Sequence, residues 1–154
     1  VIIKNIYLIS WDVVLRAMKR KWYTKQISRP SNMQGGLSVA ELGAHFDFKV
    51  ERIFYLQGIK EGEVRGNHAH EELSQFILCL AGSFLIEMDD GGSKEQVQMT
   101  ANGIGLFVDG LVWRKMWQFS SDAVMLVLCD RIYEQDLVIT DYSKFKQLAS
   151  ESRA

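Results

Sequence analysis

The chain has 154 residues, of which 47% are apolar, 24% charged and 11% aromatic, with 12 glycines and 1 proline. This composition excludes a disordered or fibrous chain and predicts one globular domain with its own core. The 18 basic and 19 acidic residues give a net charge of -1, so no overall field favours nucleic acid or an anionic membrane surface. No apolar run approaches the ~20 residues of a membrane helix.

The first predicted element is a short amphipathic helix near the N-terminus. Trp11, Val14, Leu15 and Met18 recur at helical spacing after Ser10, a residue type suited to an N-cap. The apolar opening is interrupted by Lys4 and Asp12, and its basic cluster follows it, so it is a poor signal peptide. We expect the basic cluster over 16–25 to be a solvated helix end, the alternative being a phosphate-binding patch.

From residue 35 the pattern changes to short runs rich in Val, Ile, Phe and Leu, separated by Gly, Asp and Ser turns. The runs cover residues 37–42, 50–57, 76–80, 84–88, 95–100, 104–108, 111–117 and 123–129. This spacing predicts an all-β fold, an antiparallel sandwich or barrel. After the runs, Asp141 caps an amphipathic stretch that predicts a terminal helix.

Four other features have ordinary structural explanations. Cys79 and Cys129 lie in apolar runs, which predicts buried thiols in a reducing, cytoplasmic setting rather than a disulfide. The stretch 89–92, Asp-Asp-Gly-Gly, predicts a hairpin turn rather than a calcium site. His45 stands alone, and we expect it to be a solvated loop residue.

The motif that carries chemistry is centred on His68 and His70, two of only three histidines. Residues i and i+2 of a strand face the same side, so both imidazoles point into one space, the lumen if the strand lines a barrel. The wider spacing Gly62-x5-His68-x-His70-x4-Gln75-x6-Gly82 matches the first cupin motif, with Gln75 where a metal-binding Glu normally stands.

The second cupin motif normally completes a metal site with another histidine, and here that position falls on Arg114. A guanidinium has no free lone pair, and two imidazoles with one neutral amide form a weak ligand set for a divalent ion. We therefore expect a metal-free barrel. Two roles remain open for the histidine pair: acid/base catalysis near neutral pH, or a hydrogen-bonded role in the core.

Longer segments resemble one family. These are RGNHAHEELSQFILCLAGSFLIEMDDG, GLFVDGLVWRKMWQFSSDAVMLVLCD, GGLSVAEL and VERIFYL, within residues 33–147. They are similar to the cupin-type nucleotide-sugar 3,4-ketoisomerases of the FdtA and WxcM type. The resemblance implies a jelly-roll barrel, a homodimer with exchanged strands, no metal or other cofactor, and a dTDP-4-keto-6-deoxyglucose substrate whose ketone moves from C4 to C3. It further implies a place in the biosynthesis of deoxyamino sugars for surface polysaccharides.

The resemblance also implies site residues. His68 would be the base, with Arg65 and His70 lining the pocket beside it. Further candidates for substrate binding are Arg52, Gln75, Trp113 and Arg114, and Tyr55 is a second catalytic candidate. Trp113 is equally well explained by core packing, and Tyr55 by an outward-facing strand position.

Two departures from the family pattern affect this assignment. The family commonly reads RVYY where this chain reads RIFY, so a tyrosine hydroxyl is replaced by Phe54. It commonly reads VWHEM where this chain has VWRKM, so Arg114 replaces a histidine. A phenyl ring cannot relay a proton, so Tyr55, Arg114 or water would take over that step, or the reaction differs, or catalysis is lost.

Two hypotheses therefore stand: an isomerase, or a relative of it such as a sugar epimerase, and a non-catalytic barrel that binds a sugar nucleotide or serves as a partner subunit. An open cavity that reaches His68 favours the enzyme, whereas a lumen plugged by Phe54 and Arg114 favours the second hypothesis. Because the family start aligns near Met18, we expect residues 1–17 to be an extension and residues 18–154 to be a single domain.

Overall fold

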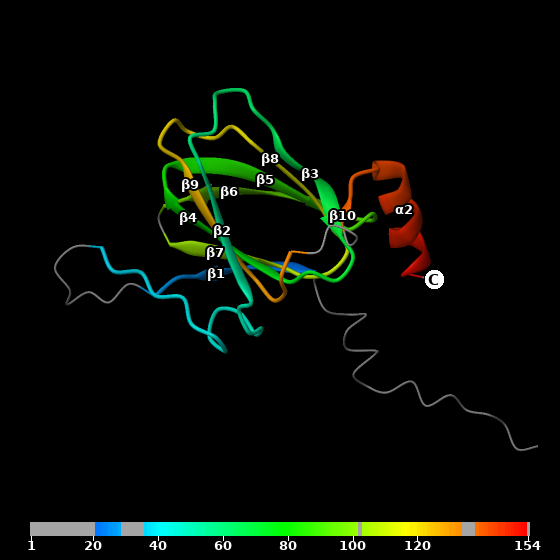
Figure 1. The fold of residues 1–154 in the computed structure, drawn as a ribbon, viewed down its shortest axis with the longest axis horizontal. Helices are drawn as coiled ribbons and strands as arrows, with labels where there is room; N and C mark the ends of the chain where they lie inside the picture. The colour runs from blue at the N-terminus through cyan, green and yellow to red at the C-terminus, as the bar shows by residue number, and fades with distance from the viewer. Residues whose placement is uncertain (1–20, 29–35, 102, 134–137, 154) are drawn as a thin grey trace, which may run out of the picture.

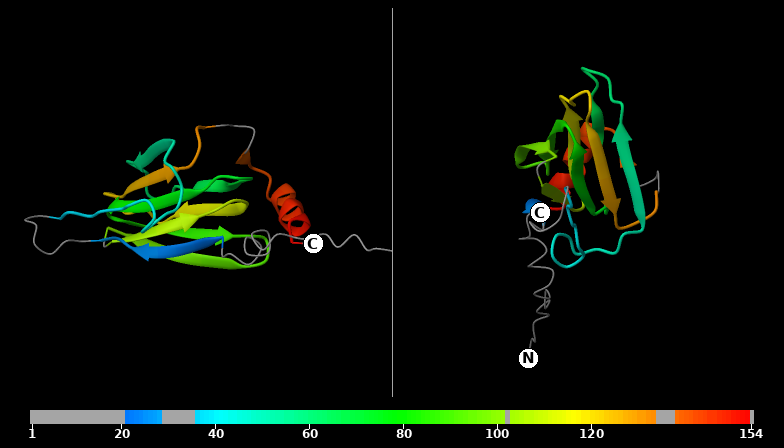
Figure 2. Two further views of the ribbon diagram at one scale, coloured as in Figure 1. Left: turned by 90° about the horizontal axis from the view of Figure 1, so that it is seen from below. Right: turned by 90° about the vertical axis from the view of Figure 1, so that its left-hand side faces the viewer.

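The computed structural model describes residues 21–28, 36–101, 103–133 and 138–153 as two five-stranded antiparallel sheets packed face to face (Figures 1 and 2). The first sheet, in spatial order, contains β1 (Trp22–Gln26), β7 (Ile104–Val108), β4 (Gln75–Ala81), β9 (Val124–Cys129) and β2 (Arg52–Gln57). The second contains β10 (Val138–Ile139), β3 (Arg65–His70), β8 (Val112–Trp117), β5 (Ser83–Asp89) and β6 (Lys94–Thr100). The predicted all-β sandwich is confirmed.

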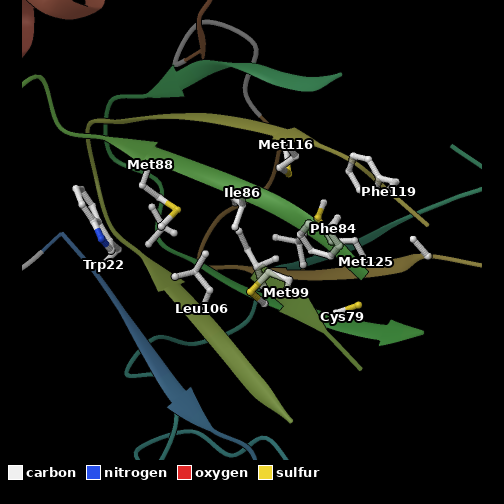
Figure 3. Packing of buried hydrophobic residues seen from close by; sticks show 14 of the residues in the cluster. Trp22, Cys79, Phe84, Ile86, Met88, Met99, Leu106, Met116, Phe119 and Met125 are labelled. Carbon is white, nitrogen blue, oxygen red and sulfur yellow. The ribbon is translucent and has the colours of Figure 1, made fainter. Parts of the chain in front are cut away.

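The space between the sheets has two unlike sides. On the closed side, formed by β1 and β7 against β5 and β6, inward side chains such as Trp22, Ile86 and Leu106 form an apolar core, and the Trp22 ring N–H donates to Glu95. Phe84, Ile86 and Met88 of β5 are fully buried there, as are Met99 on the neighbouring β6 and Leu106 on β7 of the other sheet (Figure 3). Burial of this much apolar surface is what holds the two sheets together.

On the open side, formed by β2 and β9 against β3 and β10, inward positions carry polar residues as well as apolar ones. The burial of β2 alternates between half-buried and exposed residues, because its inner face borders a cavity rather than a packed core. Strands β4 and β8 lie between the two sides and contribute to both. The barrel is thus packed along one flank and hollow along the other.

Several predicted elements differ from the observed ones. Seven of the eight predicted runs lie on strands, but residues 37–42 contribute only isolated bridges at Val39 and Leu42. This segment, with Phe46 and Phe48, folds over the outer face of the first sheet and covers Phe76 and Phe107. Ala40, Phe46 and Phe48 are therefore explained by packing against a sheet rather than by pairing within one, whereas Leu37 and Leu42 are exposed.

His45 lies in the same segment and corrects an expectation. It is buried rather than solvated, with 5% of its surface exposed. Its Nδ1 accepts a hydrogen bond of 3.0 Å from the backbone N–H of Glu41, and its carbonyl accepts one from the Tyr23 hydroxyl. The His45 ring therefore stabilises a local turn. The sequence around His45 does not predict this role.

The predicted C-terminal helix is confirmed as α2 (Tyr142–Glu151), with Asp141 accepting hydrogen bonds from the N–H groups of Ser143 and Lys144. It lies beside β10, outside the sheets (Figure 1). The predicted hairpin turn is also confirmed, since Asp90 Oδ1 accepts from the N–H groups of Gly92 and Ser93.

Some expectations fall outside the described residues, namely the N-terminal helix and the extension over 1–17. Both cysteines, Cys79 and Cys129, are buried free thiols, as expected. Within the described ranges, no helix is long and apolar enough to cross a membrane.

Candidate active site

The open side encloses a cavity of about 560 Å³ that reaches both histidines. Polar and aromatic residues meet in its wall from both sheets: Arg52, Phe54, Arg65, His68, His70, Gln75, Arg114 and Tyr133. Apolar positions such as Leu56, Ile77 and Val127 complete it. Six of the predicted site residues are thereby brought together: Arg52, Arg65, His68, His70, Gln75 and Arg114.

A β-bulge in β3 explains how Arg65 and His68 reach one cavity. Residues three apart on a regular strand point to opposite faces, but the pairing of β3 with β8 shifts between Gly66 and His68. Gly66 and Asn67 both adopt a positive φ, 82° and 55°. A Cβ atom at Gly66 would lie 2.5 Å from the carbonyl oxygen of Arg114, so this position requires glycine for space as well as for conformation.

The two imidazoles form a hydrogen-bonded pair whose tautomers can be assigned. Nδ1 of His68 lies 3.0 Å from the carbonyl oxygen of Gly66, which can only accept, so this nitrogen carries the proton. Nε2 of His68 lies 3.2 Å from Nε2 of His70. When His68 is neutral, its Nε2 holds the lone pair and His70 Nε2 donates to it. The basic nitrogen of the pair is therefore Nε2 of His68, a residue that lines the cavity.

Burial and nearby cations favour the neutral form of both rings. Desolvation lowers the pKa of His68, and the Arg114 guanidinium lowers it further, although the bond to Gly66 opposes both effects. For His70, desolvation together with Arg114, His68 and Arg52 lowers the pKa to about 3. Both imidazoles are therefore neutral at neutral pH, and His68 is ready to accept a proton.

The cavity carries positive charge without a matching carboxylate in its wall. Arg52, Arg65 and Arg114 all line it, and no Asp or Glu does so among the described residues. The Arg65 side chain is 49% exposed and contacts Glu63 at 3.0 Å, which marks the solvent end of the cavity. A ligand that fills such a space is expected to be an anion.

Aromatic and sulfur contacts position Arg52. Its guanidinium carbon lies 5.7 Å from the ring centre of Phe54 and 5.4 Å from that of Tyr133, within cation–π range. Its Nη2 donates to Sγ of Cys129 at 3.5 Å, and its Nε is buried without a partner. The same sulfur accepts from Nε2 of Gln75 at 3.6 Å. The side chain of Gln75, which lines the cavity, is thus held by the thiol of Cys129.

The structure corrects two predicted site residues. Tyr55 is 62% exposed and points away from the cavity, because it alternates with Phe54 and Leu56 along β2. Trp113 alternates with Arg114 in the same way, so it leaves the lumen and packs against α2, where its ring centre lies 5.6 Å from that of Phe145. Trp113 therefore does not contact a ligand in the cavity.

Two aromatic residues of the cavity wall were not among the predicted site residues. Tyr133 follows β9 in an irregular segment, where no periodic pattern fixes the direction of its side chain. Phe54 was noted only for its missing hydroxyl, yet its half-buried ring forms part of the wall. The alternation of β2, with Arg52 and Leu56 on the same face, could have placed Phe54 there.

The donor set at the site does not suit a metal ion. His68 and His70 donate to or accept from each other, Gln75 bonds to a thiol, and Arg114 cannot ligate. No group of three His, Cys, Asp or Glu side chains suited to a metal occurs in the part of the chain that the structure describes.

Two antiparallel sheets packed into a small barrel form the jelly-roll architecture of the cupin class, and the histidine pair lies on its inner wall. Within that class, the chain belongs to the FdtA family, described as WxcM-like, C-terminal, whose model matches residues 20–150.

The relatives agree with this assignment in sequence and in structure. The chain is 36% identical over 114 residues to TDP-4-oxo-6-deoxy-alpha-D-glucose-3,4-oxoisomerase of Aneurinibacillus thermoaerophilus, covering 74% of this chain and 82% of the relative. WlaRA of Campylobacter jejuni, a TDP-fucose-3,4-ketoisomerase, matches with a TM-score of 0.79 at 28% identity, covering 84% of this chain and 96% of that one. QdtA of Thermoanaerobacterium thermosaccharolyticum, a 3,4-ketoisomerase solved as a histidine-to-asparagine variant with TDP-4-keto-6-deoxyglucose, matches with a TM-score of 0.81 at 25% identity, covering 87% and 97%.

Proposed function

We propose that this protein is an isomerase of a nucleotide-activated 4-keto-6-deoxy sugar and moves the ketone from C4 to C3. The observation that carries the proposal is the open cavity whose wall holds the paired His68 and His70 together with three arginines. Relatives with this fold act on TDP-linked sugars, as their names state. TDP-4-keto-6-deoxyglucose is the substrate we expect.

The reaction needs one group that takes a proton from carbon and returns it to the neighbouring carbon. His68 removes the C3 proton, and the electron pair moves onto the C4 oxygen to give an enediolate. The proton of the C3 hydroxyl passes to the C4 oxygen, and His68 returns the first proton to C4 as the C3 oxygen becomes the new ketone. No electron leaves the substrate, so no redox cofactor is required.

The charged groups suggest how the substrate lies. Arg65, partly exposed at the cavity mouth, and Arg52, held between Phe54 and Tyr133, are placed to bind the diphosphate. The sugar would then extend inward to His68, His70 and Gln75. In QdtA, the histidine and the arginine altered in the solved variants have the same separation along the chain as His68 and Arg114, which supports this placement.

The alternative, a non-catalytic binding module, is less well supported. It requires a lumen plugged by Phe54 and Arg114, whereas both residues form walls of a cavity that extends to the histidines. Phe54 itself lacks the hydroxyl of the family pattern, so the two hypotheses are separated by a direct test of exchange. We also propose that catalysis is metal-independent and survives prolonged treatment with a chelator.

An apolar patch on the outer face of the first sheet supports a homodimer. Ile53, Tyr55 and Leu80 are 55–62% exposed and share one face across β2, β9 and β4. Here β1 pairs with β7 of its own chain at the sheet edge, and in a dimer with exchanged strands it would make the same pairing with the second copy. A monomeric mass by light scattering at micromolar concentration would contradict this.

We further propose a cytoplasmic enzyme of deoxyamino-sugar and surface-polysaccharide biosynthesis. Residues 1–17 would be an extension outside its single domain, in keeping with the family match that begins at residue 20. Deleting them should leave the melting temperature of the domain unchanged.

The decisive experiment is NMR of TDP-4-keto-6-deoxyglucose in heavy water with the purified protein. We expect deuterium to enter at C3 and C4 and a 3-keto product to accumulate. Binding of the substrate without any exchange would favour the non-catalytic alternative.

A further inference from the structure

Arg114 is a buried cation whose guanidinium is only partly hydrogen-bonded. Only 2% of its surface is exposed, and its Nε and Nη1 are buried without a hydrogen-bond partner. Among the described residues, its one hydrogen bond is a long one of 3.5 Å from Nη2 to the carbonyl oxygen of Leu73. Two of its three nitrogens therefore have donors to offer, and both belong to a side chain that lines the cavity.

Burial of Arg114 with two unpaired nitrogens lowers the stability of the fold unless another group accepts the missing hydrogen bonds. Burial lowers the pKa of Arg114 to about 10, so the guanidinium still carries its charge at neutral pH. A buried charge without full hydrogen bonding destabilises a fold and is normally paired. No carboxylate lines the cavity in the described parts of the chain, so the missing partner of Arg114 is expected to be an oxygen of the ligand.

The position of Arg114 decides which oxygen this is. On β8 it stands directly opposite His68 of β3, and it is close enough to both histidines to lower their pKa values. His70 and Gln75 beside it are also buried, whereas Arg65 is 49% exposed at the mouth. Arg114 therefore faces the part of the ligand that reacts with His68, not the part that reaches solvent.

We propose that Arg114 binds the ketone oxygen of the substrate and stabilises the negative charge that develops on it. This inference rests on the proposed function. When His68 takes the C3 proton, the electron pair of the broken C–H bond moves to the C4 oxygen. The free N–H groups of Arg114 donate hydrogen bonds to this negatively charged oxygen. The proton of the C3 hydroxyl then passes to the C4 oxygen, which moves the charge to the C3 oxygen, and this charge is lost as His68 returns its proton to C4 and the new ketone forms.

This role explains both departures from the family pattern together. An arginine cannot accept a proton at neutral pH, so it cannot replace a histidine as a relay, but it stabilises an oxyanion better than a neutral group does. A stabilised enediolate needs less help from a nearby acid. The absence of a hydroxyl at Phe54 is then tolerated, because the charge is held instead of being neutralised at once.

The test compares Arg114→Met with Lys115→Met, a control that removes the next cation on β8, which lies outside the cavity against Trp117. For Arg114→Met we expect the exchange rate at C3 to fall by about 10²–10³-fold, as for loss of an oxyanion donor. Affinity for TDP should stay within about twofold, while affinity for TDP-4-keto-6-deoxyglucose should fall by about tenfold or more. Lys115→Met should change none of these quantities.

Thermal stability separates this role from a structural one. Because an incompletely partnered buried charge is removed, Arg114→Met should keep or raise the melting temperature of the ligand-free protein, by about 2–4 °C for each kcal/mol gained. Arg114→Lys keeps the charge but loses the fork of donors, and it should still lose at least about tenfold in exchange rate. If Arg114→Met fails to fold and Arg114→Lys exchanges at the wild-type rate, the proposal is wrong.

Two further outcomes would also overturn it. A tenfold loss of TDP affinity with an unchanged exchange rate would make Arg114 a ligand of the diphosphate. An unchanged affinity for both ligands with an unchanged rate would leave it without a role at the ketone. Failure of the proposed function gives a different result: wild-type protein that binds the keto sugar through Arg114 but shows no exchange.

Discussion

The two sides of the barrel use the same strand geometry for opposite purposes. On the closed side, inward positions of β5 and β7 carry Phe84, Ile86 and Leu106, all fully buried and dry. On the open side, the equivalent positions of β3 and β8 carry His68, Arg114 and other polar groups around a cavity. The packed side stabilises the fold, so the hollow side can hold groups that are unsatisfied until a ligand binds.

The largest effect is expected on the open side, from His68→Asn. Asparagine keeps a hydrogen-bonding shape but cannot accept a proton at neutral pH, so C3 exchange should fall by a factor of about 10²–10⁴. Ligand affinity and the unfolding midpoint should hardly change. The measurement is deuterium uptake by NMR, with His70→Asn as the milder comparison, and equal losses in the two variants would contradict the assignment of the base.

The counterpart on the closed side is Phe84→Ala. Phe84 is fully buried, and its ring stacks on Phe119 with centres 5.2 Å apart. Truncation should lower the free energy of unfolding by about 3–5 kcal/mol, measured by urea denaturation. Leu56→Ala, at the half-buried cavity wall, should cost clearly less. Equal costs would mean that the cavity side is packed as tightly as the core.

Sequence patterns predicted the packed side better than the hollow one. Seven apolar runs were correctly placed on strands, because alternation and turn residues are local signals. The sequence predicted a strand only around His68 and His70, because β3 (RGNHAH) contains a single apolar residue and shows no clear alternation. Its bulge depends on contact between Gly66 and the backbone of Arg114, a partner 48 residues away that no local pattern specifies.

The candidate site shows the same division. His68, His70 and Gln75 followed from a spacing, and the resemblance supplied Arg52, Arg65 and Arg114. Trp113 and Tyr55 were wrong for one physical reason: each neighbours a true cavity residue on a strand, and adjacent residues face opposite ways. Tyr133 lies in an irregular segment whose direction only the tertiary structure determines.

A smaller effect is expected from acid, and it also comes from the open side. His70 has a folded-state pKa of about 3 against an ordinary value of 6.5. Between these values the unfolded chain binds a proton that the folded chain does not, so stability falls as the pH drops through this window. We expect His70→Asn to lose less stability than wild type between pH 7 and pH 4.5, measured by urea midpoints. Identical losses would show that His70 is not desolvated in the folded protein.

The smallest expected effect comes from Phe54→Tyr, which returns the hydroxyl that the family pattern contains. The ring and its contact with Arg52 at 5.7 Å are kept, so the cavity wall should be preserved and the melting temperature unchanged. Because Arg114 already holds the developing charge under our proposal, the added acid should raise the exchange rate only severalfold, short of the factor of 10² or more that general acid catalysis can contribute. Tyr55→Phe is the matched control, since it removes a hydroxyl from the next residue of β2 on the outer face and should leave the rate unchanged. A rise of 10² or more in Phe54→Tyr would show that the hydroxyl is the missing catalytic group and that Arg114 does not compensate for it.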